Sequence, residues 1–178
     1  PMIRGFSTNR LVLSVDGVRL NNAIYRGGNI HNVISISPTN IENTEVIMGS
    51  ASVLYGSDAI GGVMNFYTKK ANLSNNSDPK IQINLNSRYS SASIEKMYHF
   101  DFNYGLQKIA FLSSFSKSEF GNLTMGKNGP SDYLRPNYVG FNDAGEDILI
   151  QNPNSRVQRN TAYDQINFMQ KIFYQPIE

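Results

Sequence analysis

Residues 98–104 read Tyr-His-Phe-Asp-Phe-Asn-Tyr, with an aromatic side chain at every second position. Because successive side chains of a β-strand point to opposite faces, this alternation predicts a strand with one aromatic and one polar face. Phe suits the acyl region of a bilayer, and Tyr at the strand ends suits the headgroup region. We therefore expect the aromatic residues of this segment to face lipid; they are Tyr98, Phe100, Phe102 and Tyr104. The alternative is a soluble antiparallel sheet with one face on a core.

Three further segments predict strands of the same sheet. Residues 81–86 alternate Ile and Leu with Gln and Asn, whereas residues 109–117 and 163–174 are less regular. An open sheet edge within lipid leaves backbone groups unpaired at several kcal/mol each, so a membrane sheet must close. The four strands are therefore expected to be the first part of a larger antiparallel transmembrane β-barrel.

The connections between these segments favour the same interpretation. Residues 105–108 form a predicted tight turn, while residues 120–162 are rich in Gly, Asn, Asp and Pro and show little periodicity. A structureless stretch of this length is uncommon inside a compact soluble domain. Outer-membrane barrels combine short turns with long external loops, so we predict an extracellular loop over about 120–162.

Composition excludes several function classes. The chain has 178 residues, a net charge of +2 and only 17% charged residues, which argues against a protein that grips nucleic-acid phosphates. It has no Cys, which excludes disulfides, thiolate zinc sites and a cysteine nucleophile. No nucleophile elbow, phosphate-binding loop or local histidine metal motif occurs. We expect no enzyme, no catalytic residue, no resident metal or cofactor and no nucleic-acid partner.

The sequence shows no signal peptide at its start and no transmembrane helix. No stretch approaches the roughly 18–20 apolar residues of a transmembrane helix, and the first residues, Pro-Met-Ile-Arg-Gly, are neither a signal peptide nor an initiator Met. We therefore expect this chain to be a piece of a longer polypeptide.

The first 70 residues have a different pattern, rich in Gly and short apolar runs. Asp16-Gly17 lies between two apolar β-type runs and predicts a hairpin with a type I′ turn. Ser37-Pro38 predicts a helix start, and residues 50–55 predict a short helix that ends at Gly56. Residues 45–48 and 63–68 predict strands, and the Asn- and Ser-rich residues 71–79 a linker.

Four blocks in this region follow one another in order and spacing: IRGF at 3–6, LSVDGVR at 13–19, IENTEVIMG at 41–49 and ASVLYGSDAIGGVMN at 51–65. Together they closely resemble the second half of the plug domain of TonB-dependent outer-membrane receptors. The resemblance implies a β-rich fold, in which a small mixed α/β plug lies inside a barrel of about 22 strands. Residues 1–70 would be the C-terminal part of the plug, 71–79 the linker and 80–178 about four barrel strands.

The resemblance also implies a function. Such a receptor in the bacterial outer membrane binds a scarce nutrient and imports it with energy from the TonB-ExbB-ExbD complex, which is contacted through a segment that we expect to be absent here. Other expected partners are outer-membrane lipid, the small-molecule ligand and the remainder of the barrel. The alternatives are a passive porin or adhesin barrel, which leaves residues 3–70 unexplained, a receptor that also signals, and a transporter for cobalamin or a glycan.

The resemblance suggests site residues as well. It places ligand-facing loops at residues such as 21–32, where Tyr25, Arg26 and His31 suit haem or a ferric chelate as transported ligand. The simpler alternative for His31 is an exposed loop residue. Arg4 resembles a plug arginine that pairs with barrel acids, the alternative being a solvated arginine. The glycines expected to permit tight turns are Gly17, Gly49, Gly56, Gly61 and Gly62.

Overall fold

The computed structural model describes residues 2–3, 5–7, 10–20, 36–56 and 59–176. It divides into two compact units. The first comprises residues 1–81, 103–112 and 169–178, and the second comprises residues 82–102 and 113–168. Each unit therefore draws on segments that are distant in the sequence.

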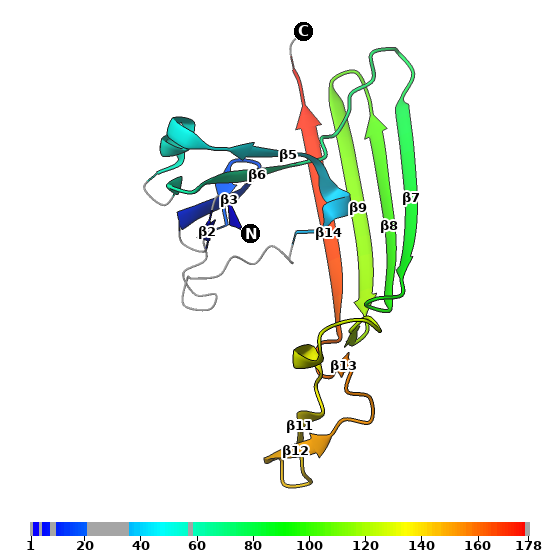
Figure 1. Cartoon of the computed structure of the whole chain (residues 1–178). Helices are drawn as coiled ribbons and strands as arrows, with labels where there is room; N and C mark the ends of the chain where they lie inside the picture. Colours follow the sequence, from blue (N-terminus) through cyan, green and yellow to red (C-terminus); the bar gives the residue numbers. More distant parts are fainter. Residues whose placement is uncertain (1, 4, 8–9, 21–35, 57–58, 177–178) are drawn as a thin grey trace. The chain divides into compact units, whose positions relative to one another are not determined.

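A four-stranded mixed sheet forms much of the first unit (Figure 1). Its strands, in the order β4-β3-β6-β5, are β4 (Val18–Arg19), β3 (Leu11–Val15), β6 (Gly62–Thr68) and β5 (Ile41–Ile47). β3 is parallel to β6, and the other two pairings are antiparallel. A separate short pair joins β1 (Met2–Ile3) to β2 (Phe6–Ser7).

Apolar side chains cover both faces of strand β3. Leu11 and Leu13 pack with Phe66 in one cluster, and Val12 packs with Val63 in another. Strands that are buried on both faces read as continuous apolar runs rather than as alternating ones. This explains why residues 11–13 are consecutive Leu, Val and Leu, all with no exposed surface.

The predicted Asp-Gly hairpin is confirmed. Val15 pairs with Val18, so Asp16 and Gly17 are the only residues of the connection. Their φ angles are 49° and 83°, as a type I′ turn requires. The turn fixes the position of the Asp16 side chain at the end of β3.

The described helices are all of the 3₁₀ type: η3 (Pro38–Asn40), η4 (Gly49–Tyr55) and η6 (Ser131–Tyr133). The helix predicted at residues 50–55 is present and ends before Gly56, but the expected mixed α/β plug shows no α-helix in its described part. Segments of three to seven residues are too short to repay the cost of α-helix nucleation. Ser37 is the N-cap of η3, without a side-chain cap hydrogen bond. Within the ranges described, no helix is both long and apolar enough to cross a membrane.

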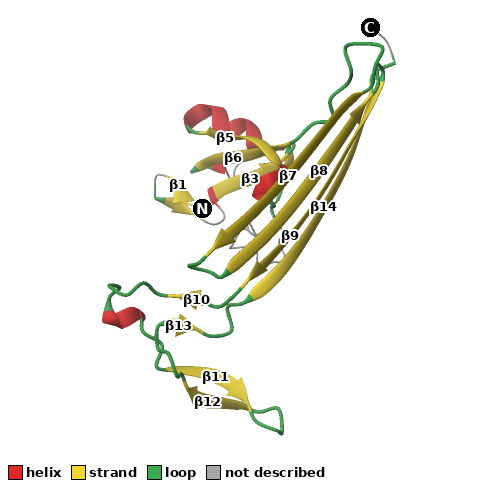
Figure 2. Ribbon diagram, turned by 90° about the vertical axis from the view of Figure 1, so that its right-hand side faces the viewer, coloured by secondary structure: helices red, strands yellow, loops and turns green. Residues whose placement is uncertain are grey.

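Four long strands form a second sheet, in the order β14-β9-β8-β7 (Figure 2). They are β7 (Lys80–Ser90), β8 (Glu95–Gly105), β9 (Ile109–Phe120) and β14 (Tyr163–Tyr174). All four predicted strands are thus present. They have 11 or 12 residues each, and a tilted strand of about 9–11 residues crosses a bilayer's hydrocarbon layer.

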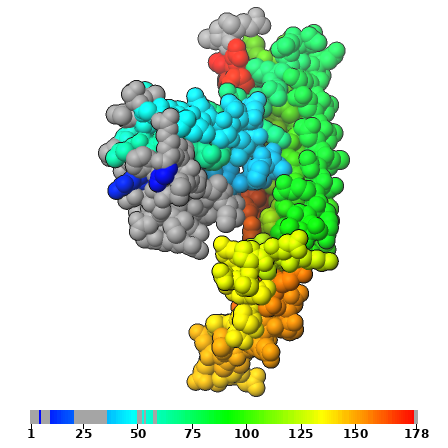
Figure 3. Space-filling view, viewed as in Figure 1, coloured from blue at the N-terminus to red at the C-terminus, as the bar shows by residue number. Residues whose placement is uncertain are grey.

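Residues 120–162 contain more regular structure than the sequence indicated (yellow to orange in Figure 3). β11 (Asn137–Phe141) pairs with β12 (Asp147–Gln151), and β10 (Leu123–Thr124) pairs with β13 (Val157–Gln158). The turn between β11 and β12 is closed by Asn142, whose side-chain oxygen accepts hydrogen bonds from the N–H groups of Ala144 and Glu146. The expectation of little regular structure is therefore wrong for this segment. Its strands are too short to produce a clear period in the sequence.

Candidate functional site

Four of the predicted site residues lie outside the described residues. These are Arg4, Tyr25, Arg26 and His31. Their proposed roles in ligand binding and in plug–barrel pairing therefore stay predictions.

The five predicted glycines fall into two conformational groups. Four have positive φ angles: Gly17 at 83°, Gly49 at 78°, Gly56 at 103° and Gly62 at 137°. L-residues rarely adopt these angles, so a side chain there would strain the backbone. Gly61 is buried, and its N–H donates to the Arg10 carbonyl at 2.7 Å. A role for these glycines in transport stays a prediction.

Strand β8 exposes its aromatic side chains and buries its polar ones. Tyr98 is 57% exposed and Phe100 39% exposed, whereas Asp101 is only 2% exposed. Phe102 and Tyr104 are half-buried. This arrangement is the reverse of a soluble sheet, where the apolar face is the covered one. Contact of the aromatic residues with lipid stays a prediction.

The two edge strands of the sheet, β7 and β14, also expose apolar side chains. Those exposed on β7 and β14 are Ile81, Ile83, Leu85, Tyr89, Tyr163, Ile166, Phe168, Ile172, Phe173 and Tyr174. Large contiguous apolar patches are rare on monomeric soluble proteins and mark surfaces that contact lipid or another protein.

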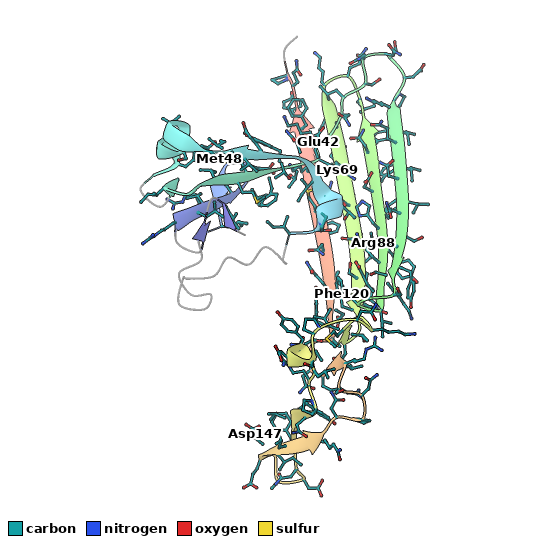
Figure 4. The ribbon with its side chains drawn as sticks, viewed as in Figure 1. Glu42, Met48, Lys69, Arg88, Phe120 and Asp147 are labelled. Atoms are coloured by element: carbon teal, nitrogen blue, oxygen red, sulfur yellow. The ribbon has the colours of Figure 1, made fainter. Side chains whose placement is uncertain are left out.

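Polar side chains of β7 and β8 bind one another. Asn84 donates to Asp101 Oδ1 at 2.6 Å, and His99 Nε2 lies 3.0 Å from Asp101 Oδ2. Arg88, which is labelled in Figure 4, forms an ion pair with Glu95. Hydrogen bonds and ion pairs of this kind offset the cost of removing polar groups from water. No group of three or more His, Cys, Asp or Glu within the described ranges could hold a metal ion.

Residues 71–74, which come after β6 in the chain, are held against the end of β8. The Asn72 N–H donates to Asn103 Oδ1 at 2.8 Å, and Asn103 Nδ2 donates to the Asn72 carbonyl at 3.1 Å. We call this two-bond contact the amide clamp. The Ser74 N–H adds a 3.0 Å hydrogen bond to the Leu106 carbonyl.

The backbone at residue 72 also passes very close to Gly105. A Cβ at Gly105 would lie 2.1 Å from the Asn72 carbonyl oxygen. Ala71 packs with Ala110 and Leu112 beside the same contact. A side chain larger than hydrogen at position 105 would therefore displace the segment that the amide clamp holds.

Asp16 makes a second contact, at the tip of the β3–β4 hairpin. Its carboxylate accepts hydrogen bonds from the Thr68 N–H at 2.8 Å, from Thr68 Oγ1 at 2.5 Å and from Lys171 Nζ at 3.0 Å. Partial burial acts to raise the pKa of Asp16, but the Thr68 hydrogen bonds and the Lys171 ammonium together outweigh it. The pKa of Asp16 therefore lies below its ordinary value.

Sequence reasoning found the position of Asp16 but not its partners. The Asp-Gly turn placed the carboxylate, whereas Thr68 and Lys171 are 52 and 155 residues away in the sequence. Asn103 was expected only as a polar residue of an alternating strand. No local pattern indicates that its amide binds the backbone of residue 72.

Comparison with known proteins identifies the class of the N-terminal region. Residues 1–63 match the family of TonB-dependent receptor plug domains. The resemblance seen in the sequence is thereby confirmed for these residues, which are similar to TonB-dependent receptor plug domains.

Two kinds of bacterial protein are among its relatives. The chain is 47% identical over 75 residues to the vitamin B12 transporter BtuB of Vibrio vulnificus strain CMCP6, a match that covers 42% of this chain and 12% of that protein. It is 38% identical over 94 residues to the heme/hemopexin utilization protein C of Haemophilus influenzae strain 86-028NP, covering 52% of this chain and 13% of that protein. The matched part is thus about an eighth of each relative's length.

Proposed function

We propose that this chain is part of an outer-membrane receptor that binds a scarce nutrient and imports it with energy supplied through TonB. The observation that carries the proposal is the order of two features along the chain. A plug domain over residues 1–63 is followed by long strands, of which β8 exposes Tyr98 and Phe100 while it buries Asp101. A passive porin or adhesin barrel would account for the strands but not for the plug.

The strands would form the first part of a barrel wall in the bacterial outer membrane. Strand β8 has its aromatic residues on the side that lipid would contact, and its polar residues on the side that a wet interior would contact. Strands β7 and β14 are the two edges of the described sheet. Further strands of the same polypeptide would pair with these edges and close the barrel.

Transport by such a receptor requires binding and movement rather than covalent chemistry. The ligand would bind at the plug loop 21–32 and at external loops such as residues 120–162. A pull on the plug, transmitted by TonB, would then open a path into the periplasm. The long strands would form the wall, and the plug glycines and hydrogen-bonded contacts would hold the plug until it is pulled.

An iron chelate or haem is the ligand class that we propose first. Tyr25 offers a ring for stacking on a porphyrin, Arg26 a cation for carboxylates and His31 an imidazole for iron. One match, over 94 residues, is to a heme/hemopexin utilization protein.

Cobalamin is the second candidate ligand. The observation that favours it is the 47% identity over 75 residues to a vitamin B12 transporter, which exceeds the 38% identity to the heme-related relative. Because both matches cover about an eighth of each relative, neither similarity extends over most of the barrel, where much of a ligand site would lie.

Uptake of labelled ligands by cells that carry the full-length receptor tests the proposal. Hemin and cobalamin are supplied separately to a strain that lacks its own receptors for them, with TonB present or deleted. We expect uptake of one ligand that disappears without TonB. Uptake that persists without TonB would instead support a passive barrel.

The role of His31 is tested in the same strain. His31→Ala should weaken hemin uptake if the imidazole binds iron, and should leave cobalamin uptake unchanged. His99→Ala is the matched control, because His99 is a buried residue of β8 that hydrogen-bonds Asp101. Equal loss of hemin uptake in both variants would contradict a specific role for His31.

A further inference from the structure

We propose that Asp16 and Lys171 form a releasable contact between the plug and strand β14, with Thr68 holding the Asp16 carboxylate in place. We call this contact the latch. The inference rests on the proposed function, because it takes β14 as part of the barrel wall. It assigns the plug residue of a plug–wall ion pair to Asp16, in addition to the contact expected for Arg4.

The hairpin presents the Asp16 carboxylate in a defined direction. Asp16 has a φ angle of 49°, and its N–H donates to the Phe66 carbonyl at 2.9 Å. This hydrogen bond ties the turn to β6 as well as to β3. Asp and Asn tolerate this backbone conformation better than most residues, so the turn itself does not require a negative charge.

Thr68 fixes the carboxylate from the plug side. Its N–H and hydroxyl together occupy both carboxylate oxygens, at 2.8 and 2.5 Å. Thr68 is the last residue of β6 and is buried. The carboxylate is therefore oriented by the plug alone, before any contact with Lys171.

Lys171 supplies the opposite charge from strand β14. The ammonium lies 3.0 Å from Asp16 Oδ2, and the two side chains are 29% and 40% exposed. Ion pairs with this degree of exposure are weak, because water screens them and holding a long side chain costs entropy. A contact of this strength can open without unfolding the β3–β6 sheet, whose core residues Leu11 and Val63 are fully buried.

The amide clamp differs from the latch in this respect. Asn103 makes two hydrogen bonds to residue 72, whose backbone lies so close to Gly105 that a Cβ there would be 2.1 Å from the Asn72 carbonyl oxygen. Residues 71–74 would therefore stay attached to β8 while the latch opens. The plug would move about its C-terminal end and release first at Asp16.

Three substitutions in the full-length receptor test the latch. Asp16→Asn keeps the shape of the side chain and is compatible with the positive φ angle of the turn, but it removes the charge. Lys171→Met removes the ammonium but keeps much of the length of the side chain. Lys127→Met is the control, because Lys127 is an exposed lysine outside the contact. Asp16→Asn combined with Lys171→Met completes a double-mutant cycle.

The measurement is ion conductance of the receptor in planar lipid bilayers, with urea added in steps to loosen the plug. We expect each single variant to raise the open fraction at a given urea concentration by roughly two- to fivefold. The double variant should open no more than the stronger single one, because both remove the same contact. Lys127→Met should match the unmodified receptor.

Several outcomes would overturn the latch. If the increases in open fraction caused by the two substitutions multiply in the double variant, Asp16 and Lys171 contribute independently. If Lys171→Met opens no more than Lys127→Met, the pair does not hold the plug. A receptor that forms no channel at any urea concentration would overturn both the barrel and the latch. If the coupling is found but deleting TonB leaves uptake unchanged, the transport proposal fails and the latch stands.

Discussion

Replacing Gly105 by Ala should loosen the attachment of residues 71–74. The added Cβ would lie 2.1 Å from the Asn72 carbonyl oxygen, 3.1 Å from the Asn72 carbonyl carbon and 3.2 Å from the Leu73 carbonyl carbon. All three neighbours are backbone atoms, so no side chain can rotate away. Relief requires a displacement of about 1.4 Å, since ordinary contacts of this kind lie near 3.5 Å.

The expected magnitude follows from what that displacement breaks. It would stretch the two hydrogen bonds of the amide clamp, now 2.8 and 3.1 Å, and the 3.0 Å bond from the Ser74 N–H. Net contributions of single hydrogen bonds are about 1 kcal/mol, and overpacking costs about 1–3 kcal/mol. We expect the free energy of opening this segment to fall by about 1–3 kcal/mol, a roughly 5- to 150-fold rise in its open population.

Hydrogen exchange of the full-length receptor in detergent measures this change. The amides of Asn72 and Ser74 are donors in the affected bonds, so a peptide containing them should exchange faster in Gly105→Ala. Gly126→Ala is the matched control, because a Cβ at Gly126 meets nothing within 4 Å. Unchanged exchange in Gly105→Ala, or equal acceleration in both variants, would refute the reasoning.

Three other predictions concern the plug contact and the sheet. The pKa of Asp16 is lowered in the folded state, so its stabilising contribution is present above its ordinary pKa near 4 and is lost as pH falls through the lower folded pKa. The urea concentration at which the channel opens should thus be constant from about pH 7 to 5 and should fall only at lower pH. Asp16→Asn should reduce this fall. Phe100→Arg should destabilise the receptor in lipid vesicles by about 2–4 kcal/mol if Phe100 faces the bilayer, and a urea titration with a change below about 0.5 kcal/mol would indicate a water-facing residue. Asp101→Ala should cost about 1–3 kcal/mol in the same titration, because Asn84 and His99 each lose a hydrogen-bond partner; a neutral result would show that water replaces the carboxylate.

Much of the fold was predictable because it depends on local patterns. The alternation at residues 98–104 predicted a strand, and the structure extends it to Glu95–Gly105. Asp16-Gly17 predicted the turn, since few pairs of consecutive residues adopt positive φ angles at both positions. The type of helix was less predictable. Residues 49–55 form a 3₁₀ helix, and a segment this short has no side-chain period that distinguishes a 3₁₀ helix from an α-helix.

The contacts of Asp16 and of residue 72 with distant segments were not predictable from the sequence. Lys171 lies on a strand whose pattern was irregular, and nothing near it in sequence marks it as a partner of Asp16. Gly105 was expected as part of a turn, whereas a Cβ at this position would meet the backbone of residue 72. Such contacts depend on the path of distant segments, which periodicity and turn chemistry do not specify.

The two edge strands have a consequence for handling the protein. In the described sheet β7 has a neighbour only in β8, and β14 only in β9, so each carries a row of backbone donors and acceptors that face away from the sheet. Edges of this kind, flanked by Ile83, Leu85 and Phe168, are templates for pairing with other chains. Residues 1–178 expressed alone should collect in inclusion bodies, and refolding in detergent should give mixed oligomers rather than monomers.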